Sequence, residues 1–155
     1  MILISHRGNI NGPEPKYENS PVRIDECINA GYDVEIDLRH LNGNYYLGHD
    51  DPQYKIDEGW LLQRNKNLWV HCKDKDAFHH ALKTRKLNCF WHDTDDYTMT
   101  SWGFVWAYPG KEPAGPQCIA VMPELHFPTP FIVKQTYYGV CSDVIEDIRN
   151  YINNK

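Results

Sequence analysis

The segment YDVEIDL, residues 32–38, indicates the kind of fold that this chain adopts. Apolar and polar side chains alternate across it, which is the pattern of a β-strand, and alternate residues of a strand share one face. The carboxylates of Glu35 and Asp37 therefore point to the same side. Elsewhere, short apolar runs alternate with amphipathic stretches, which is typical of strand and helix repeats on a largely parallel sheet. We predict an α/β protein in which this strand carries two acidic groups.

The flanking segments fit the same plan. Residues 2–5 form a short apolar strand, and residues 21–30 form a helix candidate that Ser20 can cap. The turn signal at residues 42–44 returns the chain and brings His49 beside the carboxylate pair. Further strands are expected at residues 68–73, 88–92, 103–107, 118–122 and 138–142, and further helices at residues 75–85 and 143–153.

Length and composition limit the class of protein. A chain of 155 residues, 41% of them hydrophobic, can bury one substantial core, so we predict one domain spanning residues 1–155. The formal net charge of −5 argues against a nucleic-acid partner, because such binding depends on Lys and Arg. The five cysteines are scattered without CxxC spacing, and three of them lie in apolar strand-like runs where a thiol is usually buried. We therefore expect reduced thiols in a cytoplasmic protein. The apolar run at residues 1–4 is too short for a signal peptide or membrane insertion.

Polar motifs follow the apolar runs in the first third of the chain: SHRG at 5–8, EN at 18–19, EID at 35–37 and HD at 49–50. Two imidazoles with carboxylates suit metal-assisted acid–base chemistry on a phosphate. Glu35 and Asp37 offer hard oxygen ligands for one divalent cation, Mg²⁺ or Ca²⁺. His6 and His49, whose ordinary pKa is about 6.5, can exchange roles as proton donor and acceptor. Which of them is the acid stays open.

Other residues are candidates for supporting roles. Arg7 and Lys73 can hold a phosphate, Arg through its bidentate fork and Lys as a point charge. Glu18 and Asn19 can brace the loop that carries His6 through hydrogen bonds. The sequence contains no obvious activated Ser or Cys, which fits a route without a protein nucleophile. His92 and Trp106 are weaker candidates for lining the pocket.

In order and approximate spacing, the motifs resemble those of the glycerophosphodiester phosphodiesterases, within the phosphatidylinositol-phospholipase-C-like phosphodiesterase superfamily. The matching pieces are HRG at 6–8, EN at 18–19, ExD at 35–37 and HD at 49–50, with fainter likeness at residues 68–73 and 139–143. The resemblance implies a phosphoric diester hydrolase acting on a small glycerol- or alcohol-linked phosphodiester. It also implies that a substrate hydroxyl attacks phosphorus to give a cyclic phosphate, which water then opens.

The chain departs from the family pattern in two places. His71 stands where the family has a metal-binding glutamate, so either His71 or Glu124 is expected to complete the metal site. The family's (β/α)8 barrel usually needs about 250 residues, so we expect a compact or incomplete (β/α) TIM-type barrel with fewer or shortened helices. A non-catalytic phosphate- or sugar-phosphate-binding domain stays open as the alternative. The substrate alcohol, the choice between hydrolase and cyclising lyase, and the oligomeric state are also open.

Overall fold

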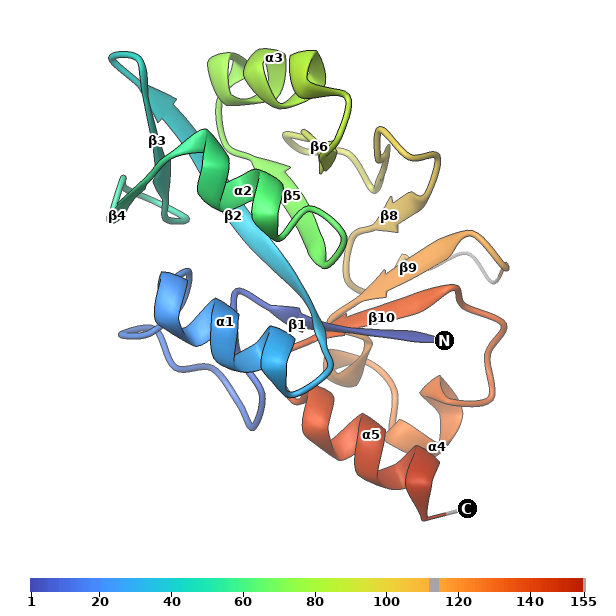
Figure 1. Ribbon diagram of the computed structural model, residues 1–155. Helices are drawn as coiled ribbons and strands as arrows, with labels where there is room; N and C mark the ends of the chain where they lie inside the picture. Colours follow the sequence, from blue (N-terminus) through green and yellow to red (C-terminus); the bar gives the residue numbers. More distant parts are fainter. Residues whose placement is uncertain (112–114, 155) are drawn as a thin grey trace.

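A computed structural model describes residues 1–111 and 115–154, and these form one curled, mixed sheet with short helices packed against it (Figure 1). The strands are β1 (Ile2–His6), β2 (Asp33–Leu41), β3 (Asn44–Leu47), β4 (Tyr54–Ile56), β5 (Leu68–Cys72), β6 (Asn88–Phe90), β7 (Tyr97–Met99), β8 (Val105–Ala107), β9 (Cys118–Val121) and β10 (Gly139–Ser142). The helices are α1 (Pro21–Asn29), α2 (Glu58–Gln63), α3 (Lys75–Thr84), α4 (Thr129–Ile132) and α5 (Ile145–Asn153), with a 3-10 turn, η1 (Pro123–Leu125).

The centre of the sheet is parallel. Strands β6, β5, β2, β1, β10, β9 and β8 lie side by side in that order, each parallel to its neighbour. The carboxyl-terminal end of the long strand β2 pairs antiparallel with β3, and β3 pairs antiparallel with β4. Strand β7 pairs antiparallel with β8. Among the described residues, no strand pairing joins β6 to β7 or β8, so the sheet forms a half-barrel that is open on this side.

The expectation of a compact or incomplete (β/α) TIM-type barrel was wrong. That fold closes eight parallel strands into a ring and follows each strand with a helix. Here the chain from β6 to β8 forms the antiparallel strand β7, and between β9 and β10 it forms only η1 and the single-turn helix α4. Parallel neighbours need a crossover of about a dozen residues or more, usually a helix. Residues 91–104 form β7 and its turns instead, so the coarse α/β class holds but the closed barrel does not.

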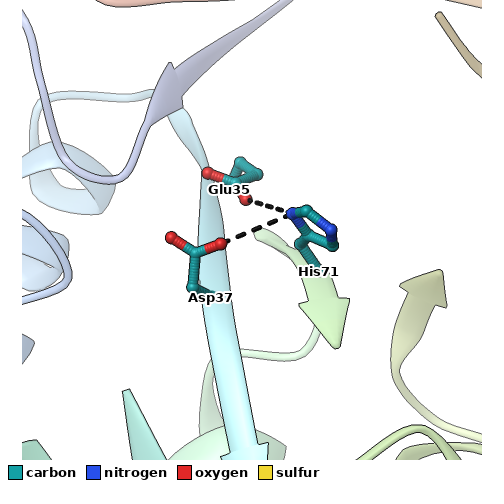
Figure 2. Close-up of side chains that lie close together, drawn as sticks. All are labelled: Glu35, Asp37 and His71. Carbon is teal, nitrogen blue, oxygen red and sulfur yellow. Dashed lines mark ion pairs between the residues drawn. The ribbon is translucent and has the colours of Figure 1, made fainter. Parts of the chain in front are cut away.

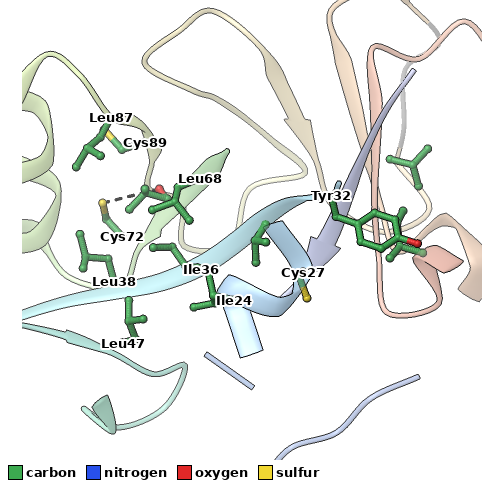
Figure 3. Packing of buried hydrophobic residues seen from close by; sticks show 14 of the residues in the cluster. Ile24, Cys27, Tyr32, Ile36, Leu38, Leu47, Leu68, Cys72, Leu87 and Cys89 are labelled. Atoms are coloured by element: carbon green, nitrogen blue, oxygen red, sulfur yellow. Dashed lines mark hydrogen bonds between the residues drawn. The ribbon is translucent and has the colours of Figure 1, made fainter. Parts of the chain in front are cut away.

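The larger core lies between the outer face of the sheet and the helices. Ile36 and Leu38 of β2 are fully buried there, and they belong to one apolar cluster with Ile24 and Cys27 of α1 (Figure 3). Burying one such aliphatic side chain contributes roughly 1.5–3 kcal/mol. Ser20 precedes α1 at the N-cap position, but its hydroxyl makes no capping hydrogen bond. Packing on the sheet is therefore the main support for this short helix.

A second, smaller core fills the inside of the curl. It comprises Ile4, Trp69, Phe90, Trp106, Ile119, Val121 and Cys141. In register, His6 of β1 lies beside Glu35 of β2, and Asp37 of β2 lies beside His71 of β5. Neighbouring residues of parallel strands point to the same face, so the polar residues near the carboxyl ends of these strands share the inner face with this core.

The structure can be compared with the expectations about the cysteines and about membrane insertion. All five cysteines are buried thiols, whereas the sequence pattern indicated burial for three of them. Among the described residues, no helix has the length and apolar character needed to cross a membrane.

Candidate active site

A cavity of about 250 Å³ opens where the parallel strands end. Residues at or just after the ends of β1, β5, β6, β8 and β9 contribute to its wall. Six of the residues that the sequence singled out line it: His6, Arg7, Glu35, His49, His71 and Lys73. The rest of the wall includes both weaker candidates, His92 and Trp106, together with Asp93, Asp95, Tyr108, Val121 and Met122. Strands far apart in the sequence thus bring the predicted basic and acidic groups into one space.

Three potential metal ligands form a cluster at this wall, and two of them, Glu35 and His71, line the cavity. Glu35 and Asp37 project from β2 toward the ring of His71 on the neighbouring strand β5 (Figure 2). The Nδ1 atom of His71 lies 3.6 Å from Glu35 Oε1 and 3.4 Å from Asp37 Oδ1. One ligand atom from each residue lies within 4.8 Å of the other two. Glu35 is 1% exposed and Asp37 is fully buried, so the protein has placed two carboxylates where water cannot fully solvate them.

The hydrogen bonds of these carboxylates leave one oxygen of each turned toward the cluster. Asp37 Oδ2 accepts a hydrogen bond from Asn19 Nδ2 at 2.9 Å and lies 3.1 Å from Arg7 Nε. Asp37 Oδ1 is buried and, among the described residues, accepts no hydrogen bond of good geometry. Glu35 Oε2 accepts the backbone N–H of Arg7 at 3.2 Å, which leaves Oε1 facing His71. A buried oxygen without a donor is what a cation site provides, so these residues fit a metal ion.

The charges within the cluster hold the carboxylate ionised. Burial raises the pKa of Asp37, but the hydrogen bond and charge of His71, the charge of Arg7 and the hydrogen bond of Asn19 outweigh it, so this pKa lies well below its ordinary value. Burial lowers the pKa of His71, and its interactions with Asp37 and Glu35 more than compensate, so that pKa is raised. The same contacts favour the protonated form of His71, whose charge offsets part of that of the two carboxylates.

His6 is held in place by a carboxylate from the other end of the chain. Its Nδ1 atom forms a 2.8 Å hydrogen bond with Oδ1 of Asp143, the residue that follows β10. Burial lowers the pKa of His6, but this hydrogen bond and the charge of Glu35 outweigh the burial and raise it. Asn9 Nδ2 donates to the same Asp143 oxygen at 2.8 Å. With Nδ1 occupied, Nε2 is the ring nitrogen available on the cavity side, and it lies 3.9 Å from Glu35 Oε2.

His49 approaches the cavity from a loop. It follows β3, its side chain is 37% exposed, and its Nδ1 atom is hydrogen-bonded to Asp50 at 2.8 Å. The guanidinium of Arg39 donates to the carbonyl oxygens of Gly48, at 3.0 Å, and of His49. The loop is therefore fixed by its backbone, while the imidazole keeps contact with solvent.

The two predicted phosphate ligands also line the cavity, but each interacts with carboxylates. Arg7 pairs with Asp37 and with Glu18, the latter through a 3.3 Å hydrogen bond from Nη1 to Oε2. Lys73 Nζ lies 3.7 Å from Asp37 Oδ1. Glu18 accepts a further hydrogen bond from Asn9 at 2.9 Å, so it contacts the loop after His6 at two residues. Asn19 contacts that loop through its backbone N–H, which donates to the carbonyl oxygen of Arg7 at 2.9 Å, and its side chain supports Asp37.

Glu124 does not join the metal-ligand cluster. Among the described residues, that cluster consists of Glu35, Asp37 and His71. Glu124 Oε1 instead accepts the backbone N–H of Asp143 at 3.1 Å, and burial raises the pKa of Glu124. Of the two residues that the sequence offered to complete the metal site, the structure brings His71 to the carboxylates.

Sequence reasoning missed one polar pair, Asn9 and Asp143. Asp143 contacts His6 across 137 positions of sequence, so no local pattern could link the two. The available signal was that Asp143 directly follows an apolar strand whose carboxyl end reaches the same edge of the sheet. Comparison of the chain with protein-family models, curated proteins and solved structures found no match in any of the three. The site geometry is therefore the basis for a functional proposal.

Proposed function

We propose that this protein is a metal-dependent phosphodiesterase that cleaves a small glycerol- or alcohol-linked phosphodiester with His6 and His49 as the proton-transfer pair. The observation that carries the proposal is that one cavity contains both imidazoles, Lys73 and two of the three clustered metal ligands. A volume of about 250 Å³ lies below the roughly 300–1,000 Å³ of sites for drug-sized ligands, which favours a small substrate. The resemblance to glycerophosphodiester phosphodiesterases in the HRG, EN, ExD and HD motifs supports the same reading.

The residues divide into positioning and proton-transfer groups. Lys73 and the exposed part of Arg7 attract the anionic phosphate. Asp143 fixes the tautomer and orientation of His6 through Nδ1, so that Nε2 exchanges a proton with the substrate. His49 is partly exposed and can exchange its proton with solvent between turnovers. When bound at Glu35, Asp37 and His71, a divalent ion supplies Lewis-acid polarisation of a phosphoryl oxygen.

The wall of the cavity favours a nucleophile from the substrate. None of the described residues that line it is a serine, threonine or cysteine. As the resemblance implies, the attacking oxygen is a hydroxyl of the substrate that lies next to the phosphodiester, and the first product is a cyclic phosphate. One imidazole takes the proton of that hydroxyl while the other protonates the departing alcohol.

The test is turnover of glycerophosphocholine and 2-hydroxypropyl p-nitrophenyl phosphate, which both carry a hydroxyl next to the phosphodiester, by metal-free protein supplied with Mg²⁺, Ca²⁺, Mn²⁺ or Zn²⁺. Glu35→Gln and Asp37→Asn should abolish metal-dependent turnover, and His6→Ala and His49→Ala should each lower it by about 10²–10⁴-fold. His79→Ala is the matched control, because His79 is exposed on α3 away from the cavity. A p-nitrophenol leaving group needs little protonation, so it should restore activity to whichever histidine variant lacks the acid.

The outcome also separates the enzyme from the binding-domain alternative. If wild-type protein cleaves neither substrate with any of the four ions, or if both histidine variants keep wild-type turnover, the proposal is rejected. Binding of glycerol phosphate that depends on Lys73, without turnover, would then favour a phosphate-binding domain.

A further inference from the structure

The metal-ligand cluster contains both oxygen and nitrogen donor atoms. Glu35 and Asp37 each present one oxygen, and His71 presents a ring nitrogen between them (Figure 2). Mg²⁺ and Ca²⁺ take oxygen ligands, whereas imidazole suits first-row transition ions such as Zn²⁺. Nδ1 of His71 is itself one of the three ligand atoms, so it contributes directly to which ion the cluster prefers.

Two of the three separations within the cluster fit a tetrahedral ion, and the third is at most 4.8 Å. His71 Nδ1 lies 3.4 Å from Asp37 Oδ1 and 3.6 Å from Glu35 Oε1. Tetrahedral Zn²⁺ with bonds of about 2.0–2.2 Å needs ligand separations of about 3.3–3.6 Å. Octahedral Mg²⁺ with bonds of about 2.1 Å needs adjacent ligands only about 3.0 Å apart. Ca²⁺ has longer bonds that would span the observed distances, but it requires six to eight oxygen ligands in all.

The imidazole is already oriented for this role. The ring of His71 stacks against Phe90, with centroids 4.9 Å apart and planes at 14°, and against His92, at 4.8 Å and 7°. Only 13% of the His71 side chain is exposed, so the packed rings restrict its rotation and keep Nδ1 toward the carboxylates. A ligand held in this way loses little conformational entropy when an ion binds.

Asp37 provides a second, independent indication of a cation. Its side chain is fully buried, its Oδ1 atom faces His71, and among the described residues no donor of good geometry bonds to that atom. The other oxygen, Oδ2, is already satisfied by Asn19. Within the part of the chain that the structure describes, Oδ1 is approached only by the longer ion-pair contacts of His71, at 3.4 Å, and Lys73, at 3.7 Å, so the cluster offers a buried oxygen without a close donor and not merely a concentration of acidic residues.

From these observations we infer that the cluster of Glu35, Asp37 and His71 selects an ion of the Zn²⁺ type over Mg²⁺ and Ca²⁺, and that Nδ1 of His71 determines this selectivity. The inference replaces the initial expectation of Mg²⁺ or Ca²⁺. It rests on the metal site of the proposed function, but it does not depend on phosphodiester chemistry.

The first experiment uses wild-type protein and does not measure activity. Metal-free protein is dialysed against Zn²⁺ in the presence of about a 100-fold excess of Mg²⁺ or Ca²⁺, and the metal content is then measured. We expect one Zn²⁺ per chain to remain bound. In ¹⁵N NMR of the histidine rings, Zn²⁺ should shift the Nδ1 resonance of His71, assigned with His71→Gln, and Mg²⁺ should leave it unchanged. Displacement of Zn²⁺ by Mg²⁺ or Ca²⁺, or an unshifted His71 resonance in the zinc-loaded protein, would overturn the inference.

The second experiment changes the donor set. His71→Glu supplies oxygen in place of nitrogen, which should weaken the preference for Zn²⁺. The Kd for Mg²⁺ divided by the Kd for Zn²⁺ should therefore fall by at least about tenfold. His79→Glu is the matched control, because it makes the same substitution at an exposed position of α3 and should leave the ratio unchanged. An unchanged ratio in His71→Glu would contradict the inference. The NMR measurement on wild-type protein decides the matter if this variant does not fold.

The two proposals can fail separately. A protein that binds Zn²⁺ through His71 but cleaves no phosphodiester retains the metal assignment and loses the proposed activity. A protein that turns over phosphodiesters with Mg²⁺ and shows no preference for Zn²⁺ retains the activity and loses the metal assignment.

Discussion

Replacement of Asn19 by glycine should destabilise the protein by about 2.5–4 kcal/mol. Asn19 is 1% exposed, donates from Nδ2 to Asp37 Oδ2 at 2.9 Å and accepts the Asp37 backbone N–H at 2.8 Å. The bond to the Asp37 carboxylate contributes about 1.5–3 kcal/mol, because it involves a charged group, and the bond from the backbone N–H contributes about 1 kcal/mol. Together they give the expected loss of about 2.5–4 kcal/mol. Arg7 Nε remains 3.1 Å from Oδ2 and favours the lower end of the range. Glycine accepts the positive φ of 60° without strain, so the change isolates the side-chain bonds.

Urea unfolding, followed by tryptophan fluorescence, measures this free energy. Asn19→Ala should cost roughly 1–2 kcal/mol more than Asn19→Gly, because alanine resists the left-handed backbone. Asn42→Gly is the matched control: Asn42 also has a positive φ, of 51°, but its side chain is exposed in the turn before β3. The reasoning is refuted if Asn19→Gly unfolds within about 0.5 kcal/mol of wild type, the range typical of surface substitutions. Loosening of Asp37 should also weaken metal binding about 10–100-fold.

Three further predictions concern the site. The raised pKa values of His6 and His71 stabilise the metal-free fold below about pH 6.5, and this stabilisation is lost as the pH rises through the folded-state values. Urea titrations should therefore give a smaller unfolding free energy at alkaline pH, with a weaker decline in His71→Gln; an identical pH profile for this variant would contradict the assignment. Asp143→Asn should lower the pKa of His6 in NMR titrations and reduce turnover at least tenfold, whereas an unmoved pKa would show that the hydrogen bond does not control this imidazole. Gly48→Ala should lower turnover while circular dichroism stays native, because the new Cβ would lie 2.0 Å from the Asp51 carbonyl oxygen and displace the His49 loop. Gly43→Ala, also at positive φ but with open space around it, is its control, and equal turnover in the two variants would count against the argument.

The local patterns were sufficient to predict the strands that carry the site. The alternation at residues 32–38 placed Glu35 and Asp37 on one face, and the structure has both at the inner face beside His71. This prediction succeeds because side-chain direction along a strand follows from the backbone alone. It does not require knowledge of which strand lies next to which.

Closure of the sheet could not be predicted in the same way. Residues 91–104 have no strong period, and the exposed strand β7 that forms there pairs, within the described part of the chain, with β8 alone. Whether such a segment becomes a helix over the sheet or an antiparallel edge strand depends on contacts with distant residues, which outweigh weak local propensity. The assumption of a family-like barrel supplied a helix for which this chain had no pattern.

The opening of the half-barrel, between β6 and β8, does not interrupt the strands that carry the clustered polar side chains. β10, β1, β2 and β5 are consecutive neighbours in the sheet. Asp143, His6 and His71 lie at or next to the carboxyl ends of β10, β1 and β5, and Glu35 and Asp37 lie beside them in register within the longer strand β2. Each contact within this set depends on one pairing: β10 with β1 for Asp143 and His6, β1 with β2 for His6 and Glu35, and β2 with β5 for Asp37 and His71. The missing ladder between β6 and β8 interrupts none of these pairings. The placement of the clustered groups therefore requires a contiguous arc of parallel strands and does not require a closed ring.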